Sequence, residues 1–401
     1  MHECLIRVIA QFLAGCTVPR SLNPVASTNH WLCSVLAGVF SIGLLATALS
    51  AQAASPFAGK RAILDGDIPL WTQKEYVDRT LLRIKEAGFN VYMPTVWQGR
   101  GTTWPSHYAP WDVELTHIPK TDFDPLRYVI AKAHELGIEV HPWFTLTLRQ
   151  ADILPQFVLP DAREPAFNVH DPEFRDLIAN LIDEVATKYD VDGVNLDYVR
   201  AIDLCLTPVC QEQYRTRYGK SLDVDSTLFK VSPALAPSLV EYQASAVTAM
   251  VEGIAQNVRR ARPRAVISAD VFVGQAPLNQ GQVAVEWANK RLVDVLLRMD
   301  YYRRPNLTSM AATKQELHNP DVQTFILSNM TLDDELRRGE QHYSREGKWL
   351  ADTIADVASR WPNTGVAVYF YKYLSDEQID ALRRGPFRTP SLKQPQGLQD
   401  H

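Results

Sequence analysis

Three aspartates lie at or near the ends of apolar runs that read as strands, and their carboxyl groups could meet at one site. Asp197 closes the run VNLD, Asp270 lies in VISADVF, and Asp300 lies in VDVLLRMDYY. Two neighbouring carboxyl groups can cleave a glycosidic bond when one is the nucleophile or base and the other, with a raised pKa, protonates the leaving oxygen. The alternative for each aspartate is a structural ion pair, with Arg200 or Arg298 as the partner of Asp197.

The alternation of side chains along each strand predicts which of them point into a common site, because successive residues face opposite sides of a strand. Asn195 and Asp197 share a face opposite Val194, Leu196 and Tyr198. Ser268 and Asp270 share a face opposite Ile267, Ala269 and Val271, and Arg298 and Asp300 share one opposite Val295, Leu297 and Met299. We expect the polar face of each run to point inward, with Asp197, Asp270 and Asp300 as catalytic candidates and Asn195 and Arg298 as substrate contacts.

Aromatic residues accompany these acids at the ends of other runs. Apolar C–H faces of sugars pack on aromatic rings, so we expect such residues to bind substrate. The expected contacts are His141, Trp143, Trp97, Tyr301 and one tyrosine of the last run, for which we select Tyr371 over Tyr369 and Tyr373. For any one of them a place in the core is the alternative. Asp65 and Asp67, in LDGD, receive no role.

The elements that must position these residues are repeated strand–helix units. Eight runs read as strands, beginning at Arg61, Asn90, Ile138, Asp192, Ala265, Val293, Val322 and Gly365. Segments with helical periodicity separate them, and two of these helices should stop at Gly88 and Gly137. Eight such units predict an α/β fold, a (β/α)₈ TIM barrel over residues 60–385, whose active site lies at the carboxyl ends of the strands.

Two other segments stand apart from this repeat. The stretch from about Cys205 to Pro263 is long for one connection, so we expect extra helices inserted after the fourth strand and a loop over the barrel mouth. Residues 386–401 lack periodicity and contain Pro and Gln, which predicts a disordered tail.

The first 54 residues predict export. Trp31 to Leu49 carries no charge and precedes Ala51-Gln52-Ala53, which a signal peptidase would cut after Ala53. The long leader leaves open an uncut membrane anchor. Three of the five cysteines lie in this leader, and Cys205 and Cys210 remain, which favours a disulfide in a periplasmic or extracellular protein. Two free thiols, or a zinc pair, are the alternatives.

Composition excludes some functions. The 401 residues are 46% hydrophobic and 22% charged, as in globular proteins, and the net charge is −5. Binding to nucleic acid requires a basic surface, so no nucleic-acid partner is expected. No H-x-H follows the first strand and no other His pair has ligand spacing, which argues against a metal-dependent amidohydrolase. We expect no metal and no cofactor.

Three segments resemble the glycosyl-hydrolase-like 10 family of bacterial glycosidases in order and spacing. They are GRGTTWPSHYAPW from Gly99, DPLRYVIAKAHELGIEVHPWF from Asp124 and DPEFRDLIANLIDEVATKYDVDGVNLDYVR from Asp171. The resemblance covers Arg61 to Arg200 and implies a TIM barrel that hydrolyses glycosidic bonds. It places the family's fourth-strand aspartate on Asp197, and its third-strand histidine and tryptophan on His141 and Trp143.

The fourth-strand motif is also similar to that of the alpha-amylase and related clans, in which this aspartate is the nucleophile of a retaining mechanism. The resemblance implies an acid on the fifth or sixth strand, Asp270 or Asp300, although the fifth-strand clans use Glu there. After Trp143 the family continues with Asn-Pro and a basic residue, whereas Phe144 and Thr145 follow here. The expected function is cleavage of a polysaccharide; a catalytically silent, carbohydrate-binding barrel is the alternative.

Overall fold

The computed structural model describes residues 55–115, 123–272, 275–332, 335–336 and 340–388. The predicted leader, residues 1–54, lies outside the described residues, and so do residues 389–401 of the predicted tail. Within the described ranges, no helix combines the length and apolar character that crossing a membrane requires.

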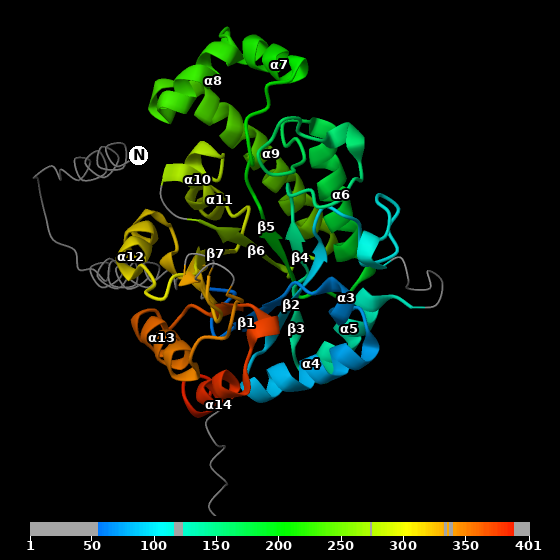
Figure 1. Cartoon of the computed structure of the whole chain (residues 1–401), viewed down its shortest axis with the longest axis vertical. Helices are drawn as coiled ribbons and strands as arrows, with labels where there is room; N and C mark the ends of the chain where they lie inside the picture. Colours follow the sequence, from blue (N-terminus) through cyan, green and yellow to red (C-terminus); the bar gives the residue numbers. More distant parts are fainter. Residues whose placement is uncertain (1–54, 116–122, 273–274, 333–334, 337–339, 389–401) are drawn as a thin grey trace, which may run out of the picture. The chain divides into compact units, whose positions relative to one another are not determined.

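All eight predicted strands are present, and neighbouring strands pair in parallel (Figure 1). The third is divided into β3 (Glu139–Val140) and β4 (Trp143–Thr145), with His141 and Pro142 between them. The others are β1 (Arg61–Asp65), β2 (Val91–Trp97), β5 (Gly193–Asp197), β6 (Val266–Val271), β7 (Val295–Asp300), β8 (Gln323–Ser328) and β9 (Val366–Tyr369). Their β-branched and aromatic residues suit a buried strand, which is why the pattern located them.

The sheet closes on itself. β1 pairs with β2 on one side and with β9 on the other, while the order from β9 to β4 follows the chain backwards. Parallel strands joined first to last, with helices between them, form a (β/α)₈ TIM barrel. The predicted fold class is therefore confirmed.

Two apolar clusters show which strand side chains face the inside of the barrel. One brings together residues of five strands: Ala62, Leu64, Val91, Met93, Val295, Leu297, Ile326 and Ala367. Side chains of strands that are not neighbours meet in the barrel interior, so this cluster marks the inward face. The larger cluster joins alternate residues of the same strands, such as Ile63, Leu296 and Phe325, to the surrounding helices.

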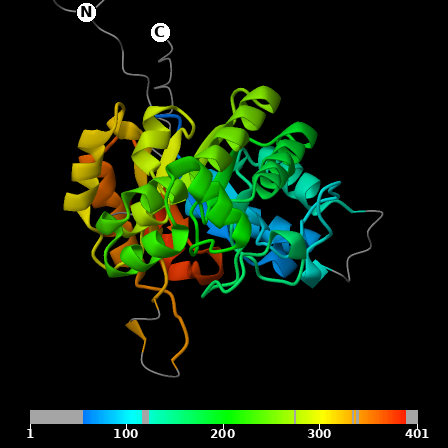
Figure 2. The ribbon, with the colours of Figure 1, turned by 90° about the horizontal axis from the view of Figure 1, so that it is seen from above.

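Helices lie outside the sheet (Figures 1 and 2). The main ones are α4 (Lys74–Ala87), α5 (Pro125–Glu135), α6 (Pro172–Lys188), α9 (Pro237–Ala261), α11 (Ala284–Asn289), α12 (Leu307–Glu316), α13 (Gly347–Arg360) and α14 (Asp376–Arg384). The side chains of Asp124 and Asp171 cap α5 and α6, each followed by proline. Gly88 ends α4 with φ +93°, and Gly137 follows α5 with φ +66°, as predicted.

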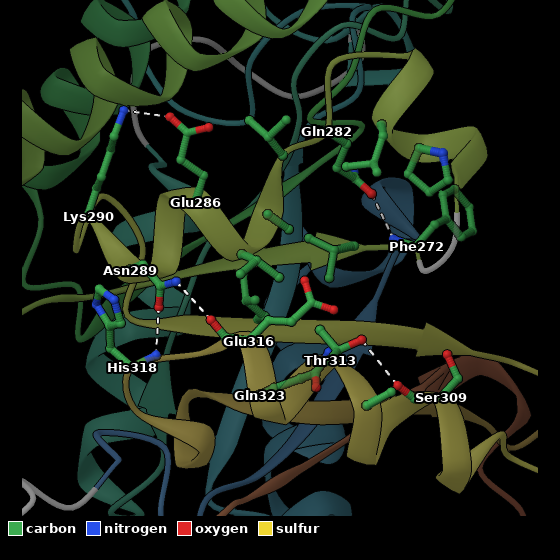
Figure 3. A pocket seen from close by; sticks show the side chains of 18 residues that line it. Phe272, Gln282, Glu286, Asn289, Lys290, Ser309, Thr313, Glu316, His318 and Gln323 are labelled. Atoms are coloured by element: carbon green, nitrogen blue, oxygen red, sulfur yellow. Dashed lines mark hydrogen bonds and ion pairs between the residues drawn. The ribbon is translucent and has the colours of Figure 1, made fainter. Parts of the chain in front are cut away.

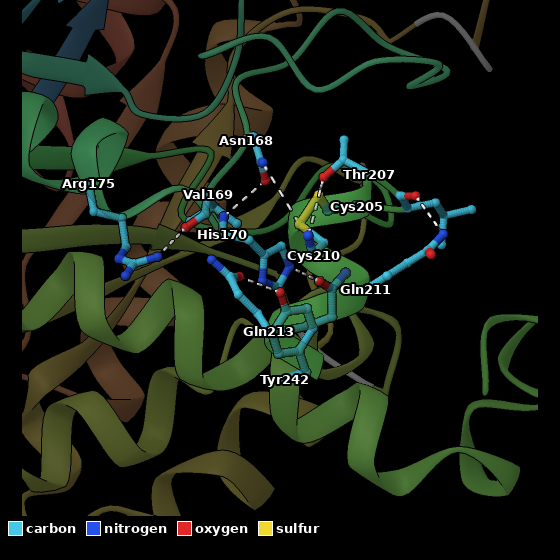
Figure 4. Close-up of a disulfide and its surroundings, with 12 residues drawn as sticks. Asn168, Val169, His170, Arg175, Cys205, Thr207, Cys210, Gln211, Gln213 and Tyr242 are labelled. Atoms are coloured by element: carbon cyan, nitrogen blue, oxygen red, sulfur yellow. Dashed lines mark hydrogen bonds between the residues drawn. A yellow bond between two sulfur atoms is a disulfide. The ribbon is translucent and has the colours of Figure 1, made fainter. Parts of the chain in front are cut away.

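The predicted insertion after β5 contains α7 (Pro208–Tyr218) and α8 (Leu222–Val231), which precede α9. It has an apolar cluster of its own, in which Tyr214 and Tyr242 meet the loop residues Leu148 and Ile202. The predicted disulfide between Cys205 and Cys210 closes a short loop at the start of α7, with Cα atoms 6.0 Å apart (Figure 4). The disulfide therefore constrains the loop that leads into α7, while the apolar cluster joins the insertion to neighbouring loops.

The C-terminal end of the described chain packs against the barrel. Phe387 is buried, its ring centroid lies 5.1 Å from that of Phe89, and the guanidinium of Arg61 lies over it. The packed part of the chain therefore includes residues that we assigned to the tail.

The first residue of β5 must be glycine for a packing reason, and this can be tested. A Cβ at Gly193 would lie 2.6 Å from His141 Nδ1 and 2.6 Å from the backbone oxygen of Val266. We expect Gly193→Ala to lower the free energy of unfolding by about 1–3 kcal/mol in urea titrations. A Cβ at Gly253, within α9, meets its nearest atom at 3.6 Å, so Gly253→Ala should be neutral or stabilising. Equal stability of the two variants would contradict this account.

Candidate active site

Asp197 lies at the carboxyl end of β5, on the inward face, and is only 6% exposed. Trp143 Nε1 donates a hydrogen bond to its Oδ2 at 3.2 Å, and the backbone N–H of Tyr198 donates to its Oδ1 at 2.6 Å. Burial raises the pKa of Asp197, while the Tyr198 N–H, the positive charge of Arg200 and Trp143 oppose that rise. The environment therefore contains three groups that favour the ionised form.

Asp270 stands beside Asp197 on the neighbouring strand. The register pairs Asn195 with Ser268 and Leu196 with Ala269, so the next pair along β5 and β6 is Asp197 and Asp270. Asn195 Nδ2 donates to Asp270 Oδ1 at 2.8 Å and to Ser268 Oγ at 3.0 Å. Burial, and then the charge of Asp197, raises the pKa of Asp270 well above its ordinary value, against the one opposing hydrogen bond of Asn195.

Aromatic rings form one wall of the mouth above these acids. The rings of Tyr301 and Tyr369 stack with centroids 5.2 Å apart, and the ring of Trp143 meets Tyr369 edge-on at 6.3 Å. Burial, followed by the charges of Asp197 and Asp270, raises the pKa of the Tyr301 hydroxyl well above its ordinary value. Tyr301 therefore keeps its proton and can donate a hydrogen bond in the mouth.

A buried polar network holds this wall in place. Arg345 Nη2 donates to the backbone oxygen of Tyr301 at 3.0 Å, and the N–H of Asn329 donates to the backbone oxygen of Tyr369 at 2.8 Å. Gln378 Nε2 donates to the backbone oxygens of both Asn329 and Arg345, each at 2.8 Å. These hydrogen bonds tie the backbone of both wall tyrosines to buried side chains.

Arg200 lies between two aromatic rings at the edge of the mouth. Its guanidinium is 4.4 Å from the ring centroid of Tyr198 and 4.9 Å from that of Phe272, which is 40% exposed. Stacking of this kind fixes a guanidinium plane while leaving its N–H groups for other partners.

The predicted inward direction of Arg298 and Asp300 is wrong. Val295 and Leu297 belong to the cluster inside the barrel, so the alternate residues of β7 face the helices. The guanidinium of Arg298 lies 5.8 Å from the ring of Phe325, and its Nη2 is 3.5 Å from Asp300 Oδ2, which accepts the backbone N–H of Asn306. The prediction takes the polar face of each run as the inward one, whereas in β7 the apolar face points inward.

Two of the expected substrate contacts, His141 and Trp97, also lie away from the mouth. His141 is fully buried, 3.4 Å from Glu139 Oε2 and against Gly193, which begins β5, so it lies toward the end of the barrel opposite the mouth. Trp97 is buried in the core, with its ring stacked on Phe167.

Tyr371 was the wrong choice in the last run. Its ring meets Tyr76 of α4 edge-on, on the helix side of the barrel. Tyr369, two residues earlier, faces inward. Tyr369 shares the inward face of Ala367 within β9, whereas Tyr371 lies beyond the end of the strand, in a short 3-10 helix (Tyr371–Tyr373) where the alternation no longer holds. Phe370, whose ring lies against Gly66, was missed because no pattern in the sequence marks it.

The first of the LDGD aspartates, Asp65, faces the helices and not the mouth. Tyr92 donates to its Oδ2 at 2.7 Å, and burial raises the pKa of Asp65 to about 7. In the part of the chain that the structure describes, no three side chains of His, Cys, Asp or Glu converge as metal ligands would.

Comparisons with known proteins agree with the barrel fold. The glycosyl hydrolase YngK of Bacillus subtilis is 28% identical over 141 residues, which are 31% of this chain and 28% of that protein. The glycosyl hydrolase DigH of Escherichia coli is 26% identical over 149 residues, 31% of this chain and 34% of that one. The matched segment thus spans about a third or less of each relative's length.

Among solved structures, the glycoside hydrolase domain of PgaB (BpsB) from Bordetella bronchiseptica superposes with a TM-score of 0.58. The match covers 81% of this chain and 98% of that domain at 12% identity, which shows a shared fold. The family model described as glycosyl hydrolase-like 10 matches residues 63–159 and 162–332, more than half of the chain. The chain therefore belongs to the glycosyl hydrolase-like 10 family.

Proposed function

We propose that this protein is an exported glycoside hydrolase that cleaves a polysaccharide with Asp197 as nucleophile and Asp270 as general acid. The observation that carries the proposal is the pair of adjacent, inward carboxyl groups whose surroundings differ. Two carboxyl groups with separated pKa values at the mouth of a barrel are the arrangement that glycoside cleavage uses.

The surroundings of the two acids assign their roles. Three groups favour the charged form of Asp197, whereas burial and the neighbouring charge keep the proton on Asp270. Asp197 would attack the anomeric carbon as Asp270 transfers its proton to the leaving oxygen, which leaves a glycosyl ester on Asp197. Asp270, now ionised, would take a proton from water as that water opens the ester, and both groups would return to their starting states.

The spacing supports a retaining mechanism. Neighbouring strands lie about 4.8 Å apart, and Asp197 and Asp270 come directly after the paired residues Leu196 and Ala269 on the adjacent strands β5 and β6. Retaining enzymes hold their two carboxyl groups about 5 Å apart, whereas inverting ones need roughly 6.5–9.5 Å to admit a water molecule.

The wall of the mouth supports a carbohydrate substrate. Tyr301, Tyr369 and Trp143 present ring faces and edges beside the two acids, and sugars bind to such surfaces through their C–H faces. The PgaB domain with which this chain shares its fold is itself described as a glycoside hydrolase.

Two observations support export: the sequence of the leader and the disulfide between Cys205 and Cys210. The uncharged run from Trp31 to Leu49 and the Ala-x-Ala sequence after it are typical of a signal peptide. The disulfide between Cys205 and Cys210 suits an oxidising compartment. The protein would then act in the periplasm or outside the cell, free or held by an uncut N-terminal anchor.

Loss of Asp197 should abolish cleavage. We expect the full chain to release sugars from at least one member of a panel of bacterial and plant polysaccharides, with and without a chelator. Asp197→Asn should lower kcat by at least about three orders of magnitude, because the covalent nucleophile is gone. Reducing-end assays and chromatography of the products measure both.

Asp300→Asn is the matched control, because Asp300 is also the last residue of a barrel strand, β7, but faces the helices. It should keep kcat within about threefold of the parent. Full activity of Asp197→Asn would exclude our assignment. If neither the parent nor any variant cleaves a glycan that they bind, the silent carbohydrate-binding barrel is the better account.

The proton on Asp270 should appear in the pH dependence of stability. The folded chain holds this proton above the pKa of an unfolded aspartate, about 4, so unfolding releases it and stability falls as pH rises. Asp270→Asn removes this pH dependence of stability. The free energy of unfolding of the variant minus that of the parent should therefore be larger at about pH 8 than at about pH 5, by at least about 1 kcal/mol in urea titrations. An unchanged difference between these pH values would show that Asp270 is ionised in the folded chain.

A further inference from the structure

A groove of about 770 Å³ lies on the outer face of the barrel, on the side of the strands that faces the helices (Figure 3). It runs over β7, between α12 on one side and α11 with the short α10 (Gln275–Asn279) on the other. This volume is within the range of small-molecule sites. The connections after β6 and β7 contain helices of only five to ten residues, which is why the barrel is less covered here.

The groove has an apolar floor and a polar rim. Leu296 of β7 and Val271 of β6 contribute buried apolar side chains to the lining, and Glu316 and Thr313 of α12 line the groove as well (Figure 3). Gln323, the first residue of β8, also lines it and is 1% exposed. Its amide oxygen is buried without a hydrogen-bond partner among the described residues. A buried acceptor of this kind costs free energy unless a ligand supplies a donor.

The groove shares a wall with the loop that follows Asp197. The backbone N–H of Ala201 donates to the oxygen of Gln280 at 2.8 Å, and the N–H of Phe272 donates to Gln282 Oε1 at 2.8 Å. Gln282 and Phe272 both line the groove. On the other side of this wall, Arg200 stacks on Phe272 and contributes its charge to Asp197. The upper end of the groove and the edge of the mouth therefore meet at Phe272.

We propose that this groove is a second binding site for a neutral oligosaccharide, which holds part of the polysaccharide chain outside the catalytic mouth. The choice of ligand class rests on the proposed function. Sugar hydroxyls would donate to Gln323 Oε1 and to the Glu316 carboxylate, while C–H faces of the rings cover the apolar floor. Binding of one chain at the groove and at the mouth raises its effective concentration at the acids.

Filling the groove should remove one bound oligosaccharide. The full chain carrying Asp197→Asn, which cannot cleave, is titrated by calorimetry with cellohexaose, galactohexaose and N-acetylchitohexaose. We expect Ala312→Trp, on an exposed residue of α12 that lines the groove, to bind one molecule fewer per chain than Ala311→Trp. Ala311 is its exposed neighbour and is not among the lining residues, so it controls for the added tryptophan. Gln323→Leu should weaken this site about three- to tenfold, as loss of one hydrogen bond does.

A kinetic measurement adds a second readout. On the polysaccharide that the parent cleaves, Ala312→Trp should raise KM by at least about threefold over Ala311→Trp and leave kcat unchanged, because the groove adds avidity and not chemistry. Equal stoichiometry and affinity in the two tryptophan variants, or binding of none of the three hexasaccharides, overturns the groove proposal. The proposed function is tested separately, because it fails if the parent cleaves no polysaccharide. The groove proposal is tested by the difference in oligosaccharide binding between Ala312→Trp and Ala311→Trp.

Discussion

Two carboxyl groups buried side by side cannot both ionise cheaply, and the arrangement of the barrel mouth depends on this constraint. Asp197 and Asp270 occupy neighbouring positions on β5 and β6, at 6% and 1% exposure. In so little water, each charge raises the cost of the other. The cost is avoided when one of the two carboxyl groups keeps its proton and the other is ionised. The Tyr198 N–H, Trp143 and Arg200 stabilise charge at one carboxyl group, while Asn195 donates a hydrogen bond to the other.

Such a division of charge requires exact placement of the strands, and the rest of the fold supplies it. Gly193 lets β5 lie against His141 and β6, so that the strand ends meet in register. On the opposite side of the mouth, buried Arg345, Asn329 and Gln378 hold the backbone of the aromatic wall. These side chains do not touch the acids, yet they decide how far the rings of Tyr301 and Tyr369 stand from them.

The sequence predicted the strands, the barrel and the place of Asp197, because apolar β-branched runs and their spacing depend on local chemistry. It did not predict which face of β7 points inward. Both faces of a strand in such a barrel are buried, so Arg298 and Asp300 could be interpreted either way, and only the packing of Val295 and Leu297 across the interior decides. The division of the third strand at His141 and Pro142 does have a signal in the sequence, because proline has no N–H to donate to a strand ladder.

The insertion after β5 has a consequence for how this protein can diverge from its relatives. Helices α7 and α8 keep an apolar cluster separate from that of the barrel, and the disulfide closes the segment where it begins. Mutations there change side chains next to the loops of the mouth without disturbing the strands that align the acids. This segment can therefore vary in sequence, or be exchanged by design, while the strands that carry Asp197 and Asp270 keep their register.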